Sequence, residues 1–191
     1  MSALFRPLVA LGLSALALSS QAATATVTSV TGSAGVTNAL AAADGIVPLN
    51  GTFWQTDAAY WSGNSATLTF QLDQAYKLSS AVITADWNDI YRFSVSTDGV
   101  NYTQLFTVSG LFDQPPAANV GAGQVTMPVT FAQTALAYQY VRVQAIFGDG
   151  SNSIGEVSFN GVAAVVPEPG SMALMAAGVG VLGFLARRRR R

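Results

Sequence analysis

The sequence contains no cysteine and no histidine, and only one tenth of its 191 residues are charged. Without cysteine there are no disulfide bonds and no thiolate chemistry. Without either residue there are no zinc sites of the Cys/His kind and no Ser-His-Asp triad. A chain of this length predicts about one domain, whose stability must come from a packed core, helped at most by a hard metal ion.

Basic residues are almost absent from the body of the chain. Arg6 and the five terminal arginines flank apolar runs, which leaves Lys77, Arg92 and Arg142 in between. Nine of the ten acidic residues lie between Asp44 and Glu156, so the body carries a net charge of −6. A body with this negative charge argues against binding nucleic acid through its phosphates.

Residues 1–22 have the three parts of a secretory signal peptide. Arg6 supplies the positive start, and residues 8–18 form an apolar core too short to span a bilayer. Ser20 and Ala22 place small residues at the positions that a signal peptidase inspects. We expect export with cleavage after Ala22 or one residue later, whereas an internal helix is the weaker reading.

Short strands separated by glycine-rich turns dominate the body, and no long stretch has the 3.6-residue period of a helix. Residues 66–72 place Leu68, Phe70 and Leu72 on one face, as a half-buried strand requires. The Asp98-Gly99 pair predicts a hairpin turn. Further strands are expected at residues 24–30, 78–85, 92–96, 102–108, 125–131, 138–146 and 154–159, with a helical turn at 37–44. This pattern predicts an all-β sandwich or barrel.

Four pieces of the body, within residues 37–161, resemble the discoidin or coagulation factor 5/8 C-type domain. They are Asp44-Gly45 leading to Thr52-Phe53-Trp54, Trp61 before the strand at 66–72, the run from Tyr91 to Tyr102, and Tyr140-Val141-Arg142-Val143 followed by Ile154-Gly155-Glu156-Val157. The resemblance implies a galactose-binding-like jelly-roll β-sandwich of eight strands. Loops at one end of that fold bind sugars, lipids or proteins.

The resemblance also implies a structural calcium ion between an early Asp-Gly loop and a late glutamate. The matching positions are Asp44, Thr52 and Glu156, with Asn50 as a further oxygen donor. Calcium takes six to eight oxygen ligands, so backbone carbonyls or water would have to complete the shell. The alternative is that Asp44 caps a turn and Glu156 is a solvated strand residue.

Residues 86–91, between two strands, form the candidate ligand site. Sugars are bound by an aromatic face and by hydrogen bonds between their hydroxyls and amide or carboxylate groups. The candidate residues are Asp86, Trp87, Asn88, Asp89 and Tyr91. The alternative is that the Asp and Asn residues only form the turn. A second aromatic group, Trp54, Tyr60 and Trp61, could line the same end but is better read as core or rim.

Catalysis is not expected. Asp86 and Asp89 could act as the paired carboxylates of a glycosidase, but their short spacing on one loop is typical of a turn or a ligand-holding group. A lysine base exists only as Lys77, which has no motif around it.

The tail has its own organisation. After a linker at residues 162–171, residues 172–186 are apolar and uncharged and predict a transmembrane helix. Fifteen helical residues reach about 23 Å, so crossing a ~30 Å core needs local thinning or arginine snorkelling. By the positive-inside rule, the C-terminus of this helix is expected in the cytoplasm. The residues that set this orientation are Arg187, Arg188, Arg189, Arg190 and Arg191.

This order of parts resembles the PEP-CTERM sorting signal of Gram-negative bacteria that make extracellular polysaccharide. The motif itself is Val166, Pro167, Glu168 and Pro169, followed by the apolar helix and the arginine cluster. The resemblance implies processing by an exosortase, with an inner-membrane precursor and a product at the cell surface or in the extracellular matrix. An ordinary tail anchor is the alternative.

Together these patterns predict an exported, exosortase-processed protein whose sandwich binds carbohydrate without catalysis. Extracellular polysaccharide is the expected ligand class. The rival interpretation is a structural or adhesion component of the matrix with no small-ligand site. An enzyme ranks last.

Overall fold

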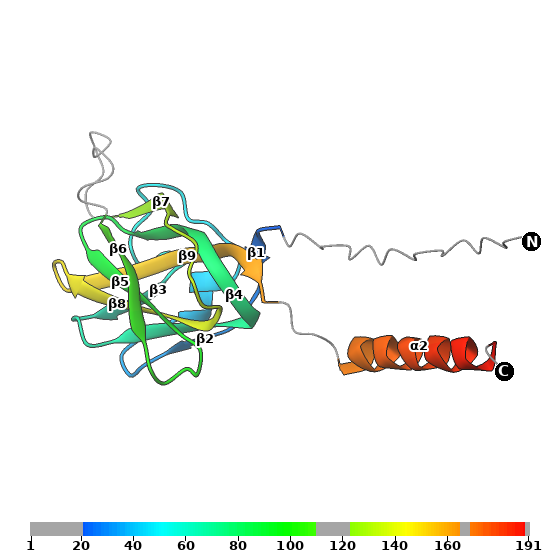
Figure 1. Ribbon diagram of the computed structural model, residues 1–191. Helices are drawn as coiled ribbons and strands as arrows, with labels where there is room; N and C mark the ends of the chain where they lie inside the picture. Colours follow the sequence, from blue (N-terminus) through cyan, green and yellow to red (C-terminus); the bar gives the residue numbers. More distant parts are fainter. Residues whose placement is uncertain (1–20, 110–122, 165–168, 190–191) are drawn as a thin grey trace, which may run out of the picture.

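The computed structural model describes residues 21–109, 123–164 and 169–189. In these ranges the chain forms a β-sandwich followed by a C-terminal helix (Figure 1). The elements are β1 (Ala23–Ala25), β2 (Val27–Gly32), η1 (Ala39–Ala43), β3 (Ala59–Ser62), β4 (Thr67–Asp86), β5 (Ile90–Ser96), β6 (Thr103–Ser109), β7 (Gln124–Thr130), β8 (Tyr138–Phe147), β9 (Ser151–Ala163) and α2 (Pro169–Arg188).

The long strand β4 joins the two layers of the sandwich. Its first part, residues 67–72, pairs with β2 and β8, and β8 continues the layer to β5 and β6. Its second part, from Tyr76 on, pairs with β9 and β7. The register shift between Gln71 and Tyr76 marks the passage from one layer to the other. All strand pairs in the described residues are antiparallel, so one continuous sheet folds over itself.

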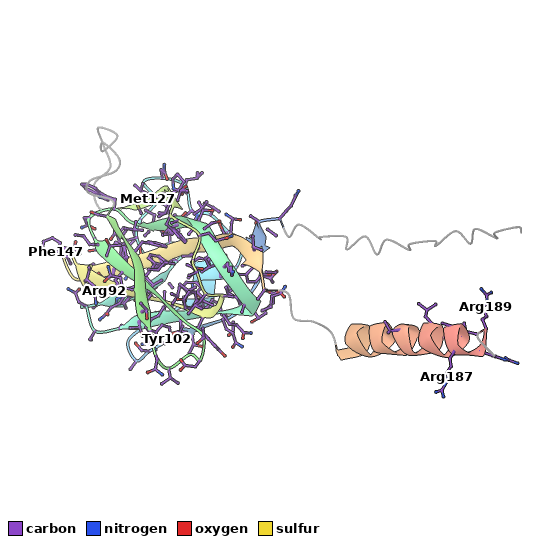
Figure 2. The ribbon with its side chains drawn as sticks, viewed as in Figure 1. Arg92, Tyr102, Met127, Phe147, Arg187 and Arg189 are labelled. Carbon is purple, nitrogen blue, oxygen red and sulfur yellow. The ribbon has the colours of Figure 1, made fainter. Side chains whose placement is uncertain are left out.

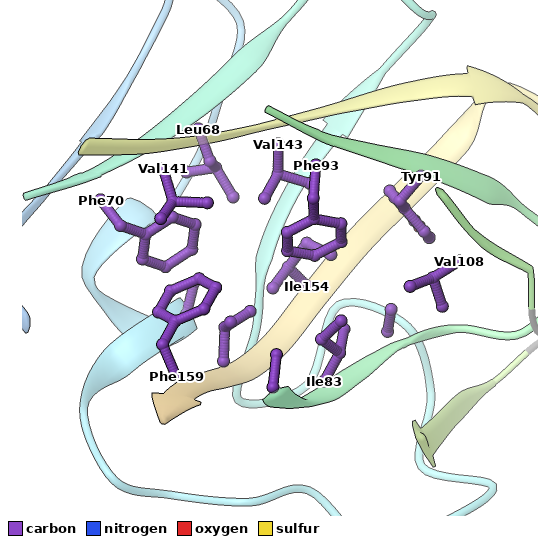
Figure 3. Packing of buried hydrophobic residues seen from close by; sticks show 14 of the residues in the cluster. Leu68, Phe70, Ile83, Tyr91, Phe93, Val108, Val141, Val143, Ile154 and Phe159 are labelled. Atoms are coloured by element: carbon purple, nitrogen blue, oxygen red, sulfur yellow. The ribbon is translucent and has the colours of Figure 1, made fainter. Parts of the chain in front are cut away.

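The core lies between these two layers. Leu68, Phe70 and Leu72 are fully buried, as their alternation predicts. Phe70 meets Phe159 of the opposite layer edge to face, with ring centroids 5.8 Å apart (Figure 3). Each large apolar side chain buried in this way contributes roughly 1.5–3 kcal/mol to folding. A core of this kind stabilises the sandwich without disulfide bonds.

Several predicted elements need correction. The strands expected at residues 66–72 and 78–85 are two parts of the single strand β4. The strand expected at 24–30 is divided into β1 and β2, which pair with β9 and β4 respectively. The short strand β3 was not predicted, and the helical turn at 37–44 is the 3₁₀ helix η1. Strand β9 continues to Ala163, beyond the expected start of the linker at 162.

The predicted tail helix at 172–186 lies within α2, which begins at Pro169 and ends at Arg188. Across the described ranges, no helix is both long and apolar enough to cross a membrane. Most of the predicted signal peptide, Val166–Glu168 of the sorting motif, and Arg190 and Arg191 lie outside the described residues.

Candidate functional site

The candidate site lies where the chain passes from one layer of the sandwich to the other. Strand β4 ends at Asp86 in the layer of β7 and β9, and β5 begins at Ile90 in the layer of β8. Residues 87–89 therefore form a corner between the layers. The β8–β9 connection, residues 148–150, is a second corner beside it, because Ile90 is opposite Phe147 in the β5–β8 pair.

A hydrogen bond joins the two corners. The side-chain amide of Asn88 donates to Oδ2 of Asp149 at 2.9 Å. The other carboxylate oxygen of Asp149 accepts from the backbone N–H of Ser151 at 2.8 Å. Phe147 precedes this turn and exposes 60% of its surface, a large fraction for a phenylalanine. Figure 2 shows its side chain pointing away from the sandwich. We call Trp87, Asn88, Phe147 and Asp149 the corner site.

Three of the five predicted ligand residues lie beneath this surface. Asp86, Asp89 and Tyr91 are fully buried, whereas Trp87 and Asn88 are half-buried. The Tyr91 hydroxyl donates to Oδ2 of Asp89 at 2.9 Å and accepts from the backbone N–H of Ser153 at 3.0 Å. The buried residues therefore hold the corner in shape, and Trp87 and Asn88 are the members that a ligand can reach. Their role in ligand binding stays a prediction.

The two buried carboxyl groups have strongly raised pKa values. Burial, with the charges of Asp89 and Asp149 adding to it, raises the pKa of Asp86 from 3.8 to about 7. The backbone groups of Trp87 and Gly123 offset only part of this shift, since within the described ranges neither oxygen of Asp86 has a partner in hydrogen-bond geometry. Burial also raises the pKa of Asp89 to about 6, although the Tyr91 hydroxyl opposes the shift.

Unused hydrogen-bonding atoms gather at the same end. Trp87 Nε1, Asn88 Oδ1, Asp89 Oδ1 and Asn152 Oδ1 are buried and have no partner in the part of the chain that the structure describes. Buried polar atoms normally have hydrogen-bond partners. A group of unpaired ones therefore indicates a place where a ligand or water binds. This pattern is typical of a site rather than of a simple turn.

The aromatic group at residues 54–61 divides between core and rim. Trp61 is 1% exposed and packs edge to face against Tyr91, so it supports the corner from inside. Trp54 and Tyr60 are half-buried and pack edge to face with each other. The interpretation of these residues as core and rim is confirmed.

The predicted calcium ligands are only partly brought together. The backbone N–H of Gly45 donates to Oε2 of Glu156 at 3.2 Å, and Asp44 accepts from the N–H of Ile46. Burial is the main cause that raises the pKa of Glu156, and the nearby Asp44 adds to it. No group of three or more acidic side chains suited to a metal exists in the described ranges. These two carboxylates alone fall short of a calcium shell, and calcium binding stays a prediction.

Sequence reasoning missed Phe147, Gly148 and Asp149 as members of the site. Gly148 has a φ of 144°, and a Cβ added there would overlap Oδ1 of Asp89. The run Phe-Gly-Asp-Gly at the end of a strand is visible in the sequence, but by itself it indicates only a turn. Its proximity to Asn88 depends on strand pairing over 61 residues.

Comparison with known families identifies the end of the chain. The PEP-CTERM protein-sorting motif matches residues 165–191. The chain ends in a PEP-CTERM sorting motif. No curated protein matches the sequence.

Solved structures match the sandwich. The chain is similar to truncated AlyQ, with CBM32 and alginate lyase domains, at a TM-score of 0.51 and 17% identity, over 78% of this chain and 36% of that one. It is similar to a Clostridium perfringens glycoside hydrolase, CpGH89, in complex with GlcNAc-alpha-1,4-galactose, at a TM-score of 0.51 and 19% identity, over 74% and 15%. The family 32 carbohydrate-binding module of C. perfringens NanJ, in complex with galactose, matches at a TM-score of 0.48 and 19% identity. The match covers 69% of this chain and 93% of that one.

The chain thus spans about a third or less of the first two proteins, and the matches cover only their carbohydrate-binding-module parts. At this identity the likeness shows the fold. The predicted all-β sandwich of the discoidin type is confirmed.

Proposed function

We propose that the sandwich binds carbohydrate non-covalently at the corner site and that the protein works at the cell surface or in the extracellular matrix. The observation that carries this proposal is the Asn88–Asp149 hydrogen bond beside the exposed ring of Phe147. An exposed aromatic ring next to an amide and a carboxylate is the combination that a sugar requires. The aromatic ring packs against the C–H groups of the sugar, and the amide and carboxylate beside it bind the sugar hydroxyls.

Each corner residue has a distinct role in this proposal. Phe147, with the half-buried Trp87, supplies the apolar platform. Asn88 and Asp149 donate to and accept from sugar hydroxyls, and a charged acceptor makes such bonds stronger than neutral pairs. Asp89 and Tyr91 are positioning residues, because their buried hydrogen bond fixes the turn that presents Trp87 and Asn88. A rigid site loses less entropy on binding.

The course of β9 agrees with a surface role. This strand begins at Ser151, next to the corner site, and ends at Ala163, next to the segment that leads to the sorting motif. The corner site and the exit of the chain therefore lie at opposite ends of the same strand. A ligand at the corner would not compete with processing at the C-terminal end.

We further propose that the sorting motif directs export and exosortase processing of an inner-membrane precursor. The match over residues 165–191 supports this proposal.

A glycan array with the full chain and Trp87→Ala tests the binding proposal. We expect the wild-type chain to retain a set of glycans and Trp87→Ala to lose them, with unchanged thermal unfolding. The control is Leu136→Ala, because Leu136 precedes β8, at the end away from Phe147, and is 61% exposed. A folded wild-type chain that retains no glycan favours the rival function, a structural matrix component without a ligand site.

A further inference from the structure

A second feature lies on the outer face of the layer formed by β2, β4, β8, β5 and β6. Side chains alternate along these strands: Val141 and Val143 of β8 are fully buried, and Arg142 between them is half-buried and faces outward. The same alternation turns Arg92 of β5 outward, because Tyr91 and Phe93 point into the core. We call this surface the arginine face.

Two rows of outward side chains cross the arginine face from strand to strand. One row contains Thr69, Arg142 and Ser94, and the next contains Thr67, Gln144 and Arg92, since these residues are opposite one another in the strand register. Arg92 and Arg142 are diagonal neighbours, which places their backbones roughly 7–8 Å apart. Neither row contains an acidic residue.

The charge of this face is opposite to that of the molecule around it. Lys77, Arg92 and Arg142 are the three cations of a body with nine acidic residues, and two of them meet here. Lys77 lies on the second part of β4, which belongs to the other layer. Strand pairing has therefore brought together two arginines that are 50 positions apart in a chain that is otherwise poor in basic residues.

Arg142 is held by an aromatic ring rather than by an acid. Its guanidinium carbon lies 3.5 Å from the centroid of the Tyr102 ring. Arg92 Nε, Arg142 Nε and the Tyr102 hydroxyl are buried and have no hydrogen-bond partner among the residues that the structure describes. Stacking fixes the plane of the guanidinium, and the described residues show no acidic partner for it, which suits it to bind an anion.

We propose that the arginine face is a separate binding surface for an acidic polysaccharide made of uronic acids. Arginine binds carboxylates in a bidentate manner, and two arginines on adjacent strands suit two carboxylates of one chain. The Thr, Ser and Gln side chains of the rows provide partners for hydroxyls between those carboxylates. Nucleic acid fits less well, because its affinity comes from neutralising many phosphates, and this face offers two arginines on a body with nine acidic residues.

Isothermal titration of the full chain with polygalacturonate tests this proposal, with dextran as the neutral comparison. We expect binding of polygalacturonate only. Arg92→Gln and Arg142→Gln should each weaken it about fivefold or more, since each removes a charge-assisted contact. The matched control is Lys77→Gln, which removes the same charge from the other layer and should change the affinity less than twofold.

Two further variants guard against misfolding and against simple charge effects. Arg142→Lys keeps the charge but loses the planar fork, so its affinity should fall between those of the wild type and Arg142→Gln. Thr69→Glu places a carboxylate opposite Arg142 without altering either arginine, and should also weaken binding. Its control is Thr130→Glu on β7, where the side chain is exposed on the other layer.

The outcomes separate this surface from the corner site. Trp87→Ala should leave polygalacturonate binding unchanged, and Arg142→Gln should leave the array signal of the corner site unchanged. Loss of polygalacturonate binding in Trp87→Ala or an equal loss in Lys77→Gln would overturn the proposal. The proposal would also be overturned if dextran bound with the same affinity as polygalacturonate, or if duplex DNA, titrated in the same way, bound more tightly.

Discussion

The hydroxyl of Tyr91 donates a hydrogen bond of 2.9 Å to Oδ2 of Asp89, and both side chains are fully buried. The same hydroxyl accepts from the N–H of Ser153 at the start of β9. This one oxygen atom thereby connects the turn at residues 87–89 to strand β9. The shape of the corner site depends on this pair.

Tyr91→Phe removes that oxygen while keeping the ring. The buried carboxylate of Asp89 and the N–H of Ser153 each lose a partner, so the free energy of unfolding should fall by about 1–3 kcal/mol. Urea denaturation measures the change. Tyr102→Phe is the control, because the Tyr102 hydroxyl has no partner among the described residues. It should change the free energy of unfolding by less than about 0.5 kcal/mol. Equal effects of the two substitutions would contradict the role of Tyr91.

The raised pKa values of Asp86 and Asp89 predict how stability depends on pH. Between pH 4 and 7 the folded chain binds more protons than the unfolded chain, because the folded-state pKa values are about 7 and about 6. The free energy of unfolding should therefore fall as the pH rises through this window, by a few kcal/mol. Asp86 is half-ionised at pH 7, so the contribution of these two groups should become constant only above about pH 8.

Asp86→Asn tests the source of this dependence, since the amide imitates the protonated carboxyl group. The variant should lose most of the slope between pH 5 and 7 in urea denaturation. Asp57→Asn changes an exposed residue with a φ of 50°, which asparagine tolerates, and should keep the slope. A wild-type stability that rises over this range would disprove the assignment.

Two glycines of the same turn separate backbone strain from contact with the site. A Cβ at Gly148 would overlap Oδ1 of Asp89, whereas a Cβ at Gly150 meets nothing within 4 Å. Both have positive φ, so both Ala substitutions should cost about 1 kcal/mol in backbone strain. Gly148→Ala should cost more and should also displace Asp89. Thermal unfolding and glycan binding both report this difference, and indistinguishable variants would exclude the contact as its cause.

Local pattern was sufficient to predict part of the fold. The β5–β6 hairpin follows from alternating side chains on either side of Asp98-Gly99, and Gly99 has the positive φ that such a turn favours. The continuity of β4 was not predictable in this way, because Asp73 and Gln74 interrupt the apolar alternation and indicate a turn. Pairing with β8 up to Gln71 and with β9 from Tyr76 on holds the strand on both flanks of this polar stretch.

The candidate site was predictable only in its first corner. Trp87 and Asn88 are next to each other in sequence, so their residue types indicated a ligand loop directly. The burial of Asp86 and Asp89 was not visible, because it follows from the passage between two layers rather than from any local pattern. Phe147 and Asp149 join the site through tertiary contacts alone.

The sorting motif predicts a change in mass. In a host with an active exosortase, the mature protein should lack the arginine cluster, and Glu168→Ala should accumulate as the uncleaved precursor. Intact-mass spectrometry of the exported protein distinguishes the two forms. Glu156→Ala, within the sandwich, is the control and should be processed as the wild type is. A mature wild-type protein that still ends in Arg191 would contradict processing.

The most direct test of the central claim is titration of Phe147→Ala and Leu136→Ala with a glycan that the wild-type chain retains. The two residues are 60% and 61% exposed; Phe147 ends β8, and Leu136 precedes the start of that strand. We predict that Phe147→Ala weakens binding by about tenfold or more, the loss of an apolar contact worth about 1.4 kcal/mol, while Leu136→Ala binds as the wild type does. Wild-type affinity in Phe147→Ala would contradict a carbohydrate site at this corner.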